Sequence, residues 1–317
     1  MMKKRILALA CTLSILVLAG CGRKEAPVEE QEGLTVLATT YPVYLMAKTL
    51  TAGVEDVTVQ RLNTGNISCL HDYTLTVDDM KLIESADLIA INGVGLETFM
   101  EDALAAAQSE VVDCSQGVEL LESLAHHHEE GDEQDHGHFD PHIWLDPENA
   151  QVMVANLGKA LSAADPVHTG TYAQNAAQAA EDLEAVKAQA KKLIDNSAAE
   201  ITGLITFHDG FQYFAQAFDL ELLAAIEEEA GSEASAKEIN EITGLVKDRG
   251  VSVIFTERNG SDATARAIAR ETGCAVGELD MLMSGQGEDL SDYAGGVMGN
   301  VAAVINGFAG AKVVSVG

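Results

Sequence analysis

The chain alternates two kinds of segment, and it does so twice. Short runs rich in β-branched residues are each followed by a stretch whose apolar residues recur at spacings of three and four. This alternation predicts parallel sheets covered by helices. The first round comprises LTVLAT, YPVYLMAKTL, VTVQRL, VDDMKLIESA, DLIAING, LETFMEDALAAA and EVVDC, and the second comprises ITGLITF, FQYFAQAF, LELLAAI, EINEITGLVKD, VSVIFTE, ATARAIARETG, CAVGEL and a last helix from about Leu290 to Phe308.

Two helical segments separate the rounds. Residues 147–163 predict one helix, and apolar residues with helical spacing predict a second from about Pro166 to Asn196. At ~1.5 Å per residue, the second helix is about 45 Å long, the length of a whole domain. We therefore predict an α/β fold of two lobes with parallel sheets, joined by one long rigid helix. The predicted parts are an amino-terminal lobe at 34–164, the connecting helix at 165–197 and a carboxyl-terminal lobe at 198–317.

The first twenty residues have the pattern of an export signal. Basic residues precede an apolar run from Ile6 to Leu18, which is shorter than the ~20 residues of a spanning helix. Leu18 to Cys21 resembles the lipobox of bacterial lipoproteins, and the alternative is a plain secretory signal. The resemblance implies a signal peptide at 1–20, acyl chains on Cys21 that hold it in membrane lipid, and a flexible tether at 21–33. We expect an extracytoplasmic protein, on the outer face of the cytoplasmic membrane or in the periplasm.

Charge and cysteine content exclude several classes of function. The chain carries 19 Lys and Arg against 50 Asp and Glu, a formal net charge of -31, which argues against a nucleic-acid partner. Beyond the signal and Cys21, only Cys69, Cys114 and Cys274 remain. Three cysteines suit neither a disulfide framework nor a Cys-based metal site. One pair could still form a bridge, and the sequence leaves open which pair.

Five of the nine histidines lie in one polar stretch, at positions 126–138. The stretch HHHEEGDEQDHGH has almost no apolar residue, so it predicts a mobile surface loop. Imidazoles mixed with carboxylates bind transition metals weakly, which favours a metal-collecting role over a polar insertion without function. The collecting residues would be His126, His127, His128, His136 and His138. A separate histidine, His168, lies where the long helix begins, and we expect it to be solvated.

Three isolated histidines follow apolar runs at the ends of predicted strands or in loops. They are His71, His142 and His208, and a fourth donor, Asp280, follows the run that ends at Leu279. Polar residues beyond the carboxyl ends of parallel strands are placed to bind a ligand. Three imidazoles and one carboxylate form the donor set of a four-coordinate zinc site. The sequence therefore predicts a zinc site with two donors from each lobe.

At these residues the sequence resembles the zinc and manganese solute-binding lipoproteins of bacterial ABC importers, the ZnuA and TroA type of the cluster A-I family. The resemblance covers nearly the whole mature chain. Its landmarks are HDYTLTVDDMKLIESADLIAINGVGLE, FDPHIWLDPENA, ITFHDGFQYFAQAFDL, IFTERNGSDATARAIARETG and LDML.

The resemblance implies a metal site in the cleft between two lobes bridged by a long helix. It places the ligands at His71, His142, His208 and Asp280. It also implies that the chain acts as a monomer, captures Zn(II) with high affinity and delivers it to the membrane subunit of an ABC permease. The histidine at position 208 and the His-rich loop favour Zn(II) over Mn(II). Cys69, close to the first ligand, could compete for the metal.

Three other functions compete with zinc import. Manganese or iron(II) could be the cargo of the same kind of importer, and a surface adhesin could use the same fold. A zinc hydrolase normally keeps three protein ligands and an open position for water, whereas this chain offers four ligands and lacks HExxH. Glu257 could serve such an enzyme as a general base, but support of a ligating histidine is the simpler role. We therefore expect no enzyme.

Overall fold

The computed structural model describes residues 33–62, 73–124, 139–227, 235–258 and 260–315. The predicted signal peptide, Cys21, nearly all of the tether, the predicted ligand His71 and the His-rich loop at 126–138 lie outside the described residues.

The amino-terminal half contains a four-stranded parallel sheet with the strand order β2-β1-β3-β4. Its strands are β1 (Leu34–Ala38), β2 (Val57–Arg61), β3 (Leu88–Ile91) and β4 (Glu110–Asp113). Its helices are α1 (Tyr41–Leu50), α2 (Val77–Ser85), the 3-10 turn η1 (Thr98–Met100) and α3 (Glu101–Ala106). Local sequence sets these starts: Thr40 caps α1 by accepting a hydrogen bond from the Val43 amide, and Thr76 and Asp79 form a capping box on α2.

The carboxyl-terminal half repeats the arrangement with the strand order β6-β5-β7-β8, again all parallel. Its strands are β5 (Leu204–His208), β6 (Leu222–Glu227), β7 (Val253–Glu257) and β8 (Ala275–Leu279). Its helices are α6 (Gln212–Ala217), α7 (Ala236–Arg249), α8 (Ala263–Thr272) and α9 (Leu290–Ala309).

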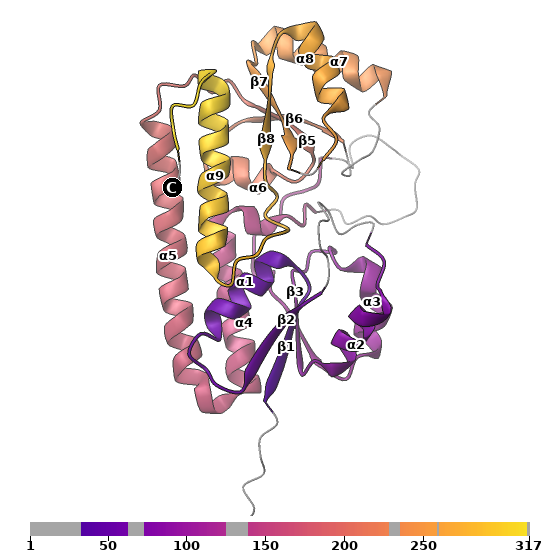
Figure 1. The fold of residues 1–317 in the computed structure, drawn as a ribbon, viewed down its shortest axis with the longest axis vertical. Helices are drawn as coiled ribbons and strands as arrows, with labels where there is room; N and C mark the ends of the chain where they lie inside the picture. The colour runs from indigo at the N-terminus through magenta and orange to yellow at the C-terminus, as the bar shows by residue number, and fades with distance from the viewer. Residues whose placement is uncertain (1–32, 63–72, 125–138, 228–234, 259, 316–317) are drawn as a thin grey trace, which may run out of the picture. The chain divides into compact units, whose positions relative to one another are not determined.

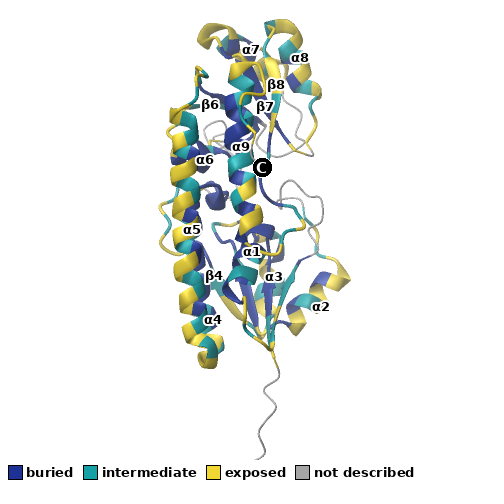
Figure 2. Ribbon diagram, turned by 60° about the vertical axis from the view of Figure 1, so that its left-hand side comes forward, coloured by how far each residue is buried: buried dark blue, intermediate teal, exposed yellow. Residues whose placement is uncertain are grey.

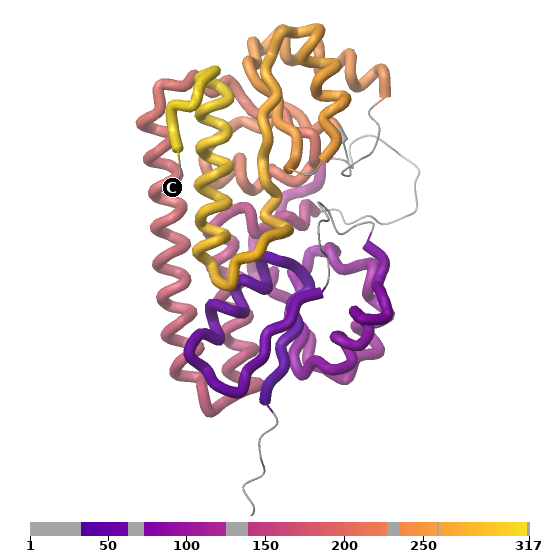
Figure 3. The backbone as a smooth tube through the Cα atoms, viewed as in Figure 1, coloured from indigo at the N-terminus to yellow at the C-terminus, as the bar shows by residue number. Residues whose placement is uncertain are grey.

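Between the sheets, the chain forms the turn η3 (Ile143–Leu145), helix α4 (Pro147–Ala164), the turn η4 (Pro166–His168) and the long helix α5 (Thr169–Asp195). Helix α5 packs along both α4 and α9, as Figures 1 and 3 show. The predicted fold class, two α/β lobes with parallel sheets and one long helix, is confirmed. The lobe boundaries themselves stay a prediction.

Both faces of each sheet are covered by apolar side chains, as expected for parallel sheets. In the first sheet, Val36 joins the largest core cluster while its neighbour Leu37 joins a smaller cluster under α2. In the second sheet, Val253 joins the largest cluster while Ile254 joins one under α7 and α8. The largest cluster therefore connects one face of each sheet through α1, α4, α5 and α9, and Figure 2 shows the inward faces of these helices as buried.

Two further findings concern the described residues alone. None of the helices described is both long and apolar enough to cross a membrane. Cys114, which is buried, and Cys274, which is partly buried, are free thiols. Cys69 lies outside the described residues, so its pairing stays open.

Candidate metal centre

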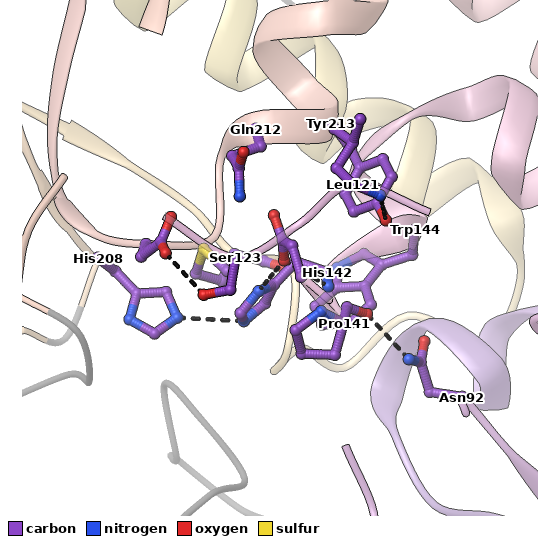
Figure 4. Close-up of polar contacts among 12 residues, drawn as sticks. Asn92, Leu121, Ser123, Pro141, His142, Trp144, His208, Gln212 and Tyr213 are labelled. Carbon is purple, nitrogen blue, oxygen red and sulfur yellow. Dashed lines mark hydrogen bonds and ion pairs between the residues drawn. The ribbon is translucent and has the colours of Figure 1, made fainter. Parts of the chain in front are cut away.

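Two of the predicted ligands face each other in a buried position. The Nε2 atoms of His142 and His208 lie 3.1 Å apart, and the two rings meet edge to face with their centroids 4.8 Å apart (Figure 4). Each residue is only 2 % exposed. His208 is the last residue of β5, and His142 directly precedes η3. The structure thus brings together one donor from each half of the chain.

A carboxylate holds the ring of His142. The Nδ1 atom of His142 lies 2.7 Å from Oδ1 of Asp140, and the same oxygen accepts a hydrogen bond from the His142 backbone amide. Because a carboxylate only accepts, Nδ1 carries the proton and Nε2 keeps its lone pair. Metal-binding histidines are commonly oriented in this way. Sequence reasoning missed Asp140, although its position two residues before the histidine was a usable signal.

A second carboxylate faces the ring of His208. The Nδ1 atom of His208 lies 3.4 Å from Oε1 of Glu257, the last residue of the neighbouring strand β7. The structure therefore places Glu257 beside the Nδ1 edge of the His208 ring, and its support of a ligating histidine stays a prediction.

The separation of the two Nε2 atoms suits a bound cation. Two nitrogens that are each ~2.0–2.1 Å from one tetrahedral zinc ion lie about 3.3 Å apart, close to the separation of His142 and His208. Without a metal, the two Nε2 atoms share one hydrogen bond, for which one ring must carry its proton on Nε2. A metal ion between the rings would take the place of that proton and accept a lone pair from each nitrogen. The donor set and its geometry therefore suit a divalent transition metal.

The loop before His142 is held by a buried network. Asn92, just after β3, donates its side-chain amide to the carbonyl of Pro141 at 2.9 Å (Figure 4). The carboxylate of Glu97 in turn accepts hydrogen bonds from Thr39 and from the backbone amides of Asn92 and Gly93. Burial raises the pKa of Glu97 to about 7, against the lowering effect of these hydrogen bonds.

Gly210 lies where the two histidines meet the segment after β8. A Cβ atom at this position would lie 2.6 Å from Cε of Met281, 2.7 Å from Cδ2 of His208 and 3.0 Å from Cε1 of His142. Real Cβ atoms do not approach other groups this closely, so a side chain here would push the histidines or Met281 away. Trp144 fixes Met281 from the other side, since its indole nitrogen donates to the Met281 carbonyl at 2.8 Å.

Asp280 precedes Met281 but has other partners. Its Oδ1 atom accepts the amide of Leu282 at 2.8 Å, and its Oδ2 atom accepts Nη1 of Arg258 at 2.5 Å. Its backbone is held on both sides by Asn300 of α9. Within the described ranges, no group of three or more His, Cys, Asp or Glu residues is placed to hold a metal ion. The structure therefore joins His142 to His208 but does not gather Asp280 with them, and His71 lies outside the description.

His168 is separate from this centre. Its Nδ1 atom lies 2.6 Å from Oδ2 of Asp165, and its side chain is 38 % exposed. His168 is therefore partly solvated, as expected, and it also pairs with the neighbouring Asp165.

Two parallel-sheet halves, a long helix packed beside them and a buried pair of carboxylate-supported imidazoles define the class of metal-binding solute-binding proteins. Comparison with protein families gives the same answer. The sequence model of the ZnuA family, described as zinc-uptake complex component A, periplasmic, matches residues 36–307. The chain belongs to this family, whose members work with ABC importers and bind metal ions. The family and the fold are those of transport proteins rather than enzymes.

Relatives of the chain differ in the metal that their names record. A protein of Treponema pallidum (strain Nichols), provisionally described as metal-binding, is 33% identical over 234 residues, which cover 70% of this chain and 72% of the relative. The zinc-binding lipoprotein AdcA of Streptococcus pneumoniae serotype 4 is 30% identical over 91% of this chain. The iron-binding protein YfeA of Yersinia pestis is 29% identical over 69% of this chain and 68% of its own length. The match with AdcA spans 57% of the length of AdcA.

Solved structures share the fold. The laminin-binding protein Lbp of Streptococcus pyogenes is 26% identical with a TM-score of 0.70, and 87% of this chain and 99% of that chain are covered. The laminin-binding protein Lmb of Streptococcus agalactiae, titled a bifunctional protein with adhesin and metal transporting activity, is 25% identical with a TM-score of 0.73, and 87% of this chain and all of that chain are covered. A manganese-bound periplasmic metal-binding protein from candidatus Liberibacter asiaticus is 22% identical with a TM-score of 0.74 over 87% of this chain and 99% of that chain, and shares the fold.

Proposed function

We propose that the chain captures Zn(II) outside the cytoplasm with high affinity and delivers it to the membrane subunit of an ABC permease. The observation that carries this proposal is the buried pair His142 and His208, in which each Nδ1 faces a carboxylate and the two Nε2 atoms lie 3.1 Å apart. Two neutral imidazoles fixed in this way bind zinc strongly, because neither ring has to be reoriented.

The full donor set of the proposal is His71, His142, His208 and Asp280. With its two histidines in place, the site needs one more imidazole and one carboxylate for the four-coordinate geometry that zinc prefers. Asp280 lies directly before Met281, whose side chain borders Gly210 together with both histidines. His71 would arrive from the segment after β2, on the amino-terminal side.

Zinc is favoured over manganese and iron(II) because imidazole-rich sites bind late first-row metals more tightly, in the order Mn²⁺ < Fe²⁺ < Zn²⁺. The relative AdcA is described as zinc-binding, and it matches more of this chain than YfeA does. Manganese and iron(II) remain the alternatives as cargo of the same site.

Three further parts complete the proposal. Cys21 is the proposed lipid anchor, with 1–20 as the signal peptide and 21–33 as the tether. The His-rich loop at 126–138 is proposed to collect metal ions near the site. The lobes at 34–164 and 198–317, joined by 165–197, are proposed to act as a monomer that closes on the metal.

An adhesin role is the second candidate, and the likeness to Lbp and Lmb favours it. A test is binding of the purified chain to immobilised laminin, with and without Ala at all four proposed ligand positions. Saturable binding that both proteins share would establish adhesion independent of metal, and no binding by either would remove this candidate.

Calorimetric titration tests the zinc proposal. The chain from residue 22 onward is stripped with chelator and titrated with Zn(II), Mn(II) and Fe(II). We expect one tight zinc site that survives deletion of 126–138 and disappears in His208→Ala. The control is His168→Ala, which removes an imidazole outside the site and should bind zinc as the unchanged chain does. Zinc binding that vanishes with the loop but survives in His208→Ala would contradict the proposal.

A further inference from the structure

The guanidinium of Arg258 binds Oδ2 of Asp280, the oxygen that the backbone amide of Leu282 does not bind. The two residues follow neighbouring strands, since β7 ends at Glu257 and β8 ends at Leu279, and these two residues are paired in the sheet. One step further along, the amide of Arg258 donates to the Leu279 carbonyl at 2.8 Å. This register places the guanidinium beside the carboxylate, with Nη1 2.5 Å from Oδ2 of Asp280.

The two oxygens of Asp280 are held in different ways. Oδ1 accepts the backbone amide of Leu282 at 2.8 Å, within a turn whose position is fixed by the buried side chain of Asn300. Oδ2 is held by a long, flexible side chain that is 60 % exposed, whereas the Asp280 side chain is 16 % exposed. Oδ2 is therefore the oxygen that can exchange its partner without a change in the backbone.

Arg258 has a second partner close by. Its Nε atom lies 3.4 Å from Oε1 of Glu278, an exposed residue of β8. A guanidinium that leaves Oδ2 can therefore remain beside Glu278 and in contact with water. This lowers the cost of moving it, because neither charge is left buried and alone.

We propose that Arg258 is a built-in competitor of the metal for Asp280, an inference that rests on the proposed function. A metal ion that binds Oδ2 displaces the guanidinium of Arg258 toward Glu278, and the guanidinium returns to Oδ2 when the metal leaves. Arg258 thus lowers the affinity and speeds release, because a dication and a guanidinium cannot share one carboxylate oxygen without strong repulsion.

Consecutive residues then act on two proposed ligands in opposite directions. Glu257 faces Nδ1 of His208 and favours metal binding, whereas Arg258 engages Asp280 and opposes it. A transport protein needs this balance, since a cargo that is held too tightly is not passed on.

The test compares Arg258→Gln with Arg249→Gln. Arg249 forms an exposed ion pair with Glu221, so its replacement removes the same charge from the same half of the chain without touching Asp280. Zinc affinity is measured by competition with a chelator, and release is measured by rapid mixing with excess chelator. We expect Arg258→Gln to bind zinc roughly threefold to tenfold more tightly and to release it correspondingly more slowly, whereas Arg249→Gln matches the unchanged chain.

Equal affinities in Arg258→Gln and Arg249→Gln, or weaker binding in Arg258→Gln, would overturn the inference. Asp280→Ala and His208→Ala are measured in the same series, so that a failure of the proposed function can be distinguished from a failure of the inference about Arg258. If both lose zinc while Arg258→Gln equals its control, the proposed function stands and the inference about Arg258 fails. If the unchanged chain binds no zinc, or His208→Ala binds it fully, the proposed function fails and the inference fails with it.

Discussion

The histidine half and the aspartate half of the proposed metal site are built differently. His142 and His208 are almost completely buried, and each faces a carboxylate that fixes its ring. Asp280 is partly exposed, and one of its oxygens binds the exposed cationic side chain of Arg258. In the proposed site, the two histidine rings would bind a metal without being reoriented, whereas the aspartate would have to exchange Arg258 for the metal. This difference suggests that, in the proposed site, the histidine pair sets how tightly the metal binds and the Asp280–Arg258 pair sets how fast it is released.

The largest expected effect comes from removing the support that Asp140 gives to His142. Asp140→Asn keeps the shape of the side chain but allows it to present an amide to Nδ1 of His142, so the ring is no longer held as the neutral Nδ1–H tautomer. We expect zinc affinity to fall by up to about 100-fold, measured by chelator competition. Asp165→Asn, which removes the acidic partner of His168, is the control and should leave affinity unchanged. Equal affinities in both variants would show that the ring of His142 does not need this support.

The next largest effect concerns stability, through Glu97 in the buried network that holds the loop before His142. Burial raises the pKa of Glu97 in the folded chain from its ordinary value of 4.5 to about 7, so the contribution of Glu97 to stability is complete at low pH and is lost as the pH rises through about 7. We expect the free energy of unfolding to fall by about 2 kcal/mol between pH 5 and pH 8 because of this one group.

Glu97→Gln removes the titrating group, so this part of the pH dependence should disappear. Unfolding by denaturant is followed through the fluorescence of Trp144, the only tryptophan in the sequence. Glu101→Gln, at an exposed position in the same segment, is the control and should keep the pH dependence of the unchanged chain. The same pH dependence in Glu97→Gln and Glu101→Gln would contradict the prediction.

A smaller effect on zinc affinity tests the packing at Gly210, where Met281 borders the histidine pair. Gly210→Ala introduces a Cβ between Met281 and the histidine pair, so one of them has to shift. We expect a loss of about tenfold in zinc affinity, because metal geometry tolerates little displacement of its ligands. Gly244→Ala places a Cβ in open space on α7, and binding should be unaffected there. A Gly210→Ala chain with normal affinity would show that the contact yields without moving the ligands.

The smallest expected effect on affinity lies in the aspartate half. Asn300→Ala removes the side chain that holds the backbone of Asp280 on both sides. We expect the free energy of unfolding to fall by about 1 to 3 kcal/mol, because the partly buried amide and carbonyl of Asp280 lose their partner. Zinc affinity should fall only severalfold, since Oδ1 is still held by Leu282. Calorimetry measures the zinc affinity and denaturant unfolding measures the stability of the same sample. A loss in affinity as large as that of Asp140→Asn would show that Asp280 needs its support as much as His142 does.

Most of the fold followed from the sequence because each element has a clear local signal. The helix predicted at 147–163 is α4 (Pro147–Ala164), which begins at a proline after the capping residue Asp146. The helix predicted from Pro166 to Asn196 is divided into η4 and α5, because Pro166 to His168 form a 3-10 turn before the regular helix starts. Apolar periodicity alone does not distinguish these two helix types over three residues.

The candidate site was predicted less completely, for a physical reason. His208 was singled out because it follows an apolar run at the end of a predicted strand, whereas His142 lies in a loop before the turn η3. The structure places their Nε2 atoms 3.1 Å apart, and their role as ligands stays a prediction. The pairing of Arg258 with Asp280 joins residues 22 positions apart and depends on the register of β7 and β8, which a single sequence does not determine. His71 and its role as a ligand stay a prediction.

A crystal structure of the zinc-loaded chain, with zinc located by its anomalous scattering, tests the proposed zinc site most directly. We expect zinc bound to Nε2 of His142 and of His208 at ~2.0–2.1 Å, with Asp280 as a further ligand and the guanidinium of Arg258 displaced from Oδ2. Zinc located elsewhere, with neither His142 nor His208 among its ligands, would contradict it.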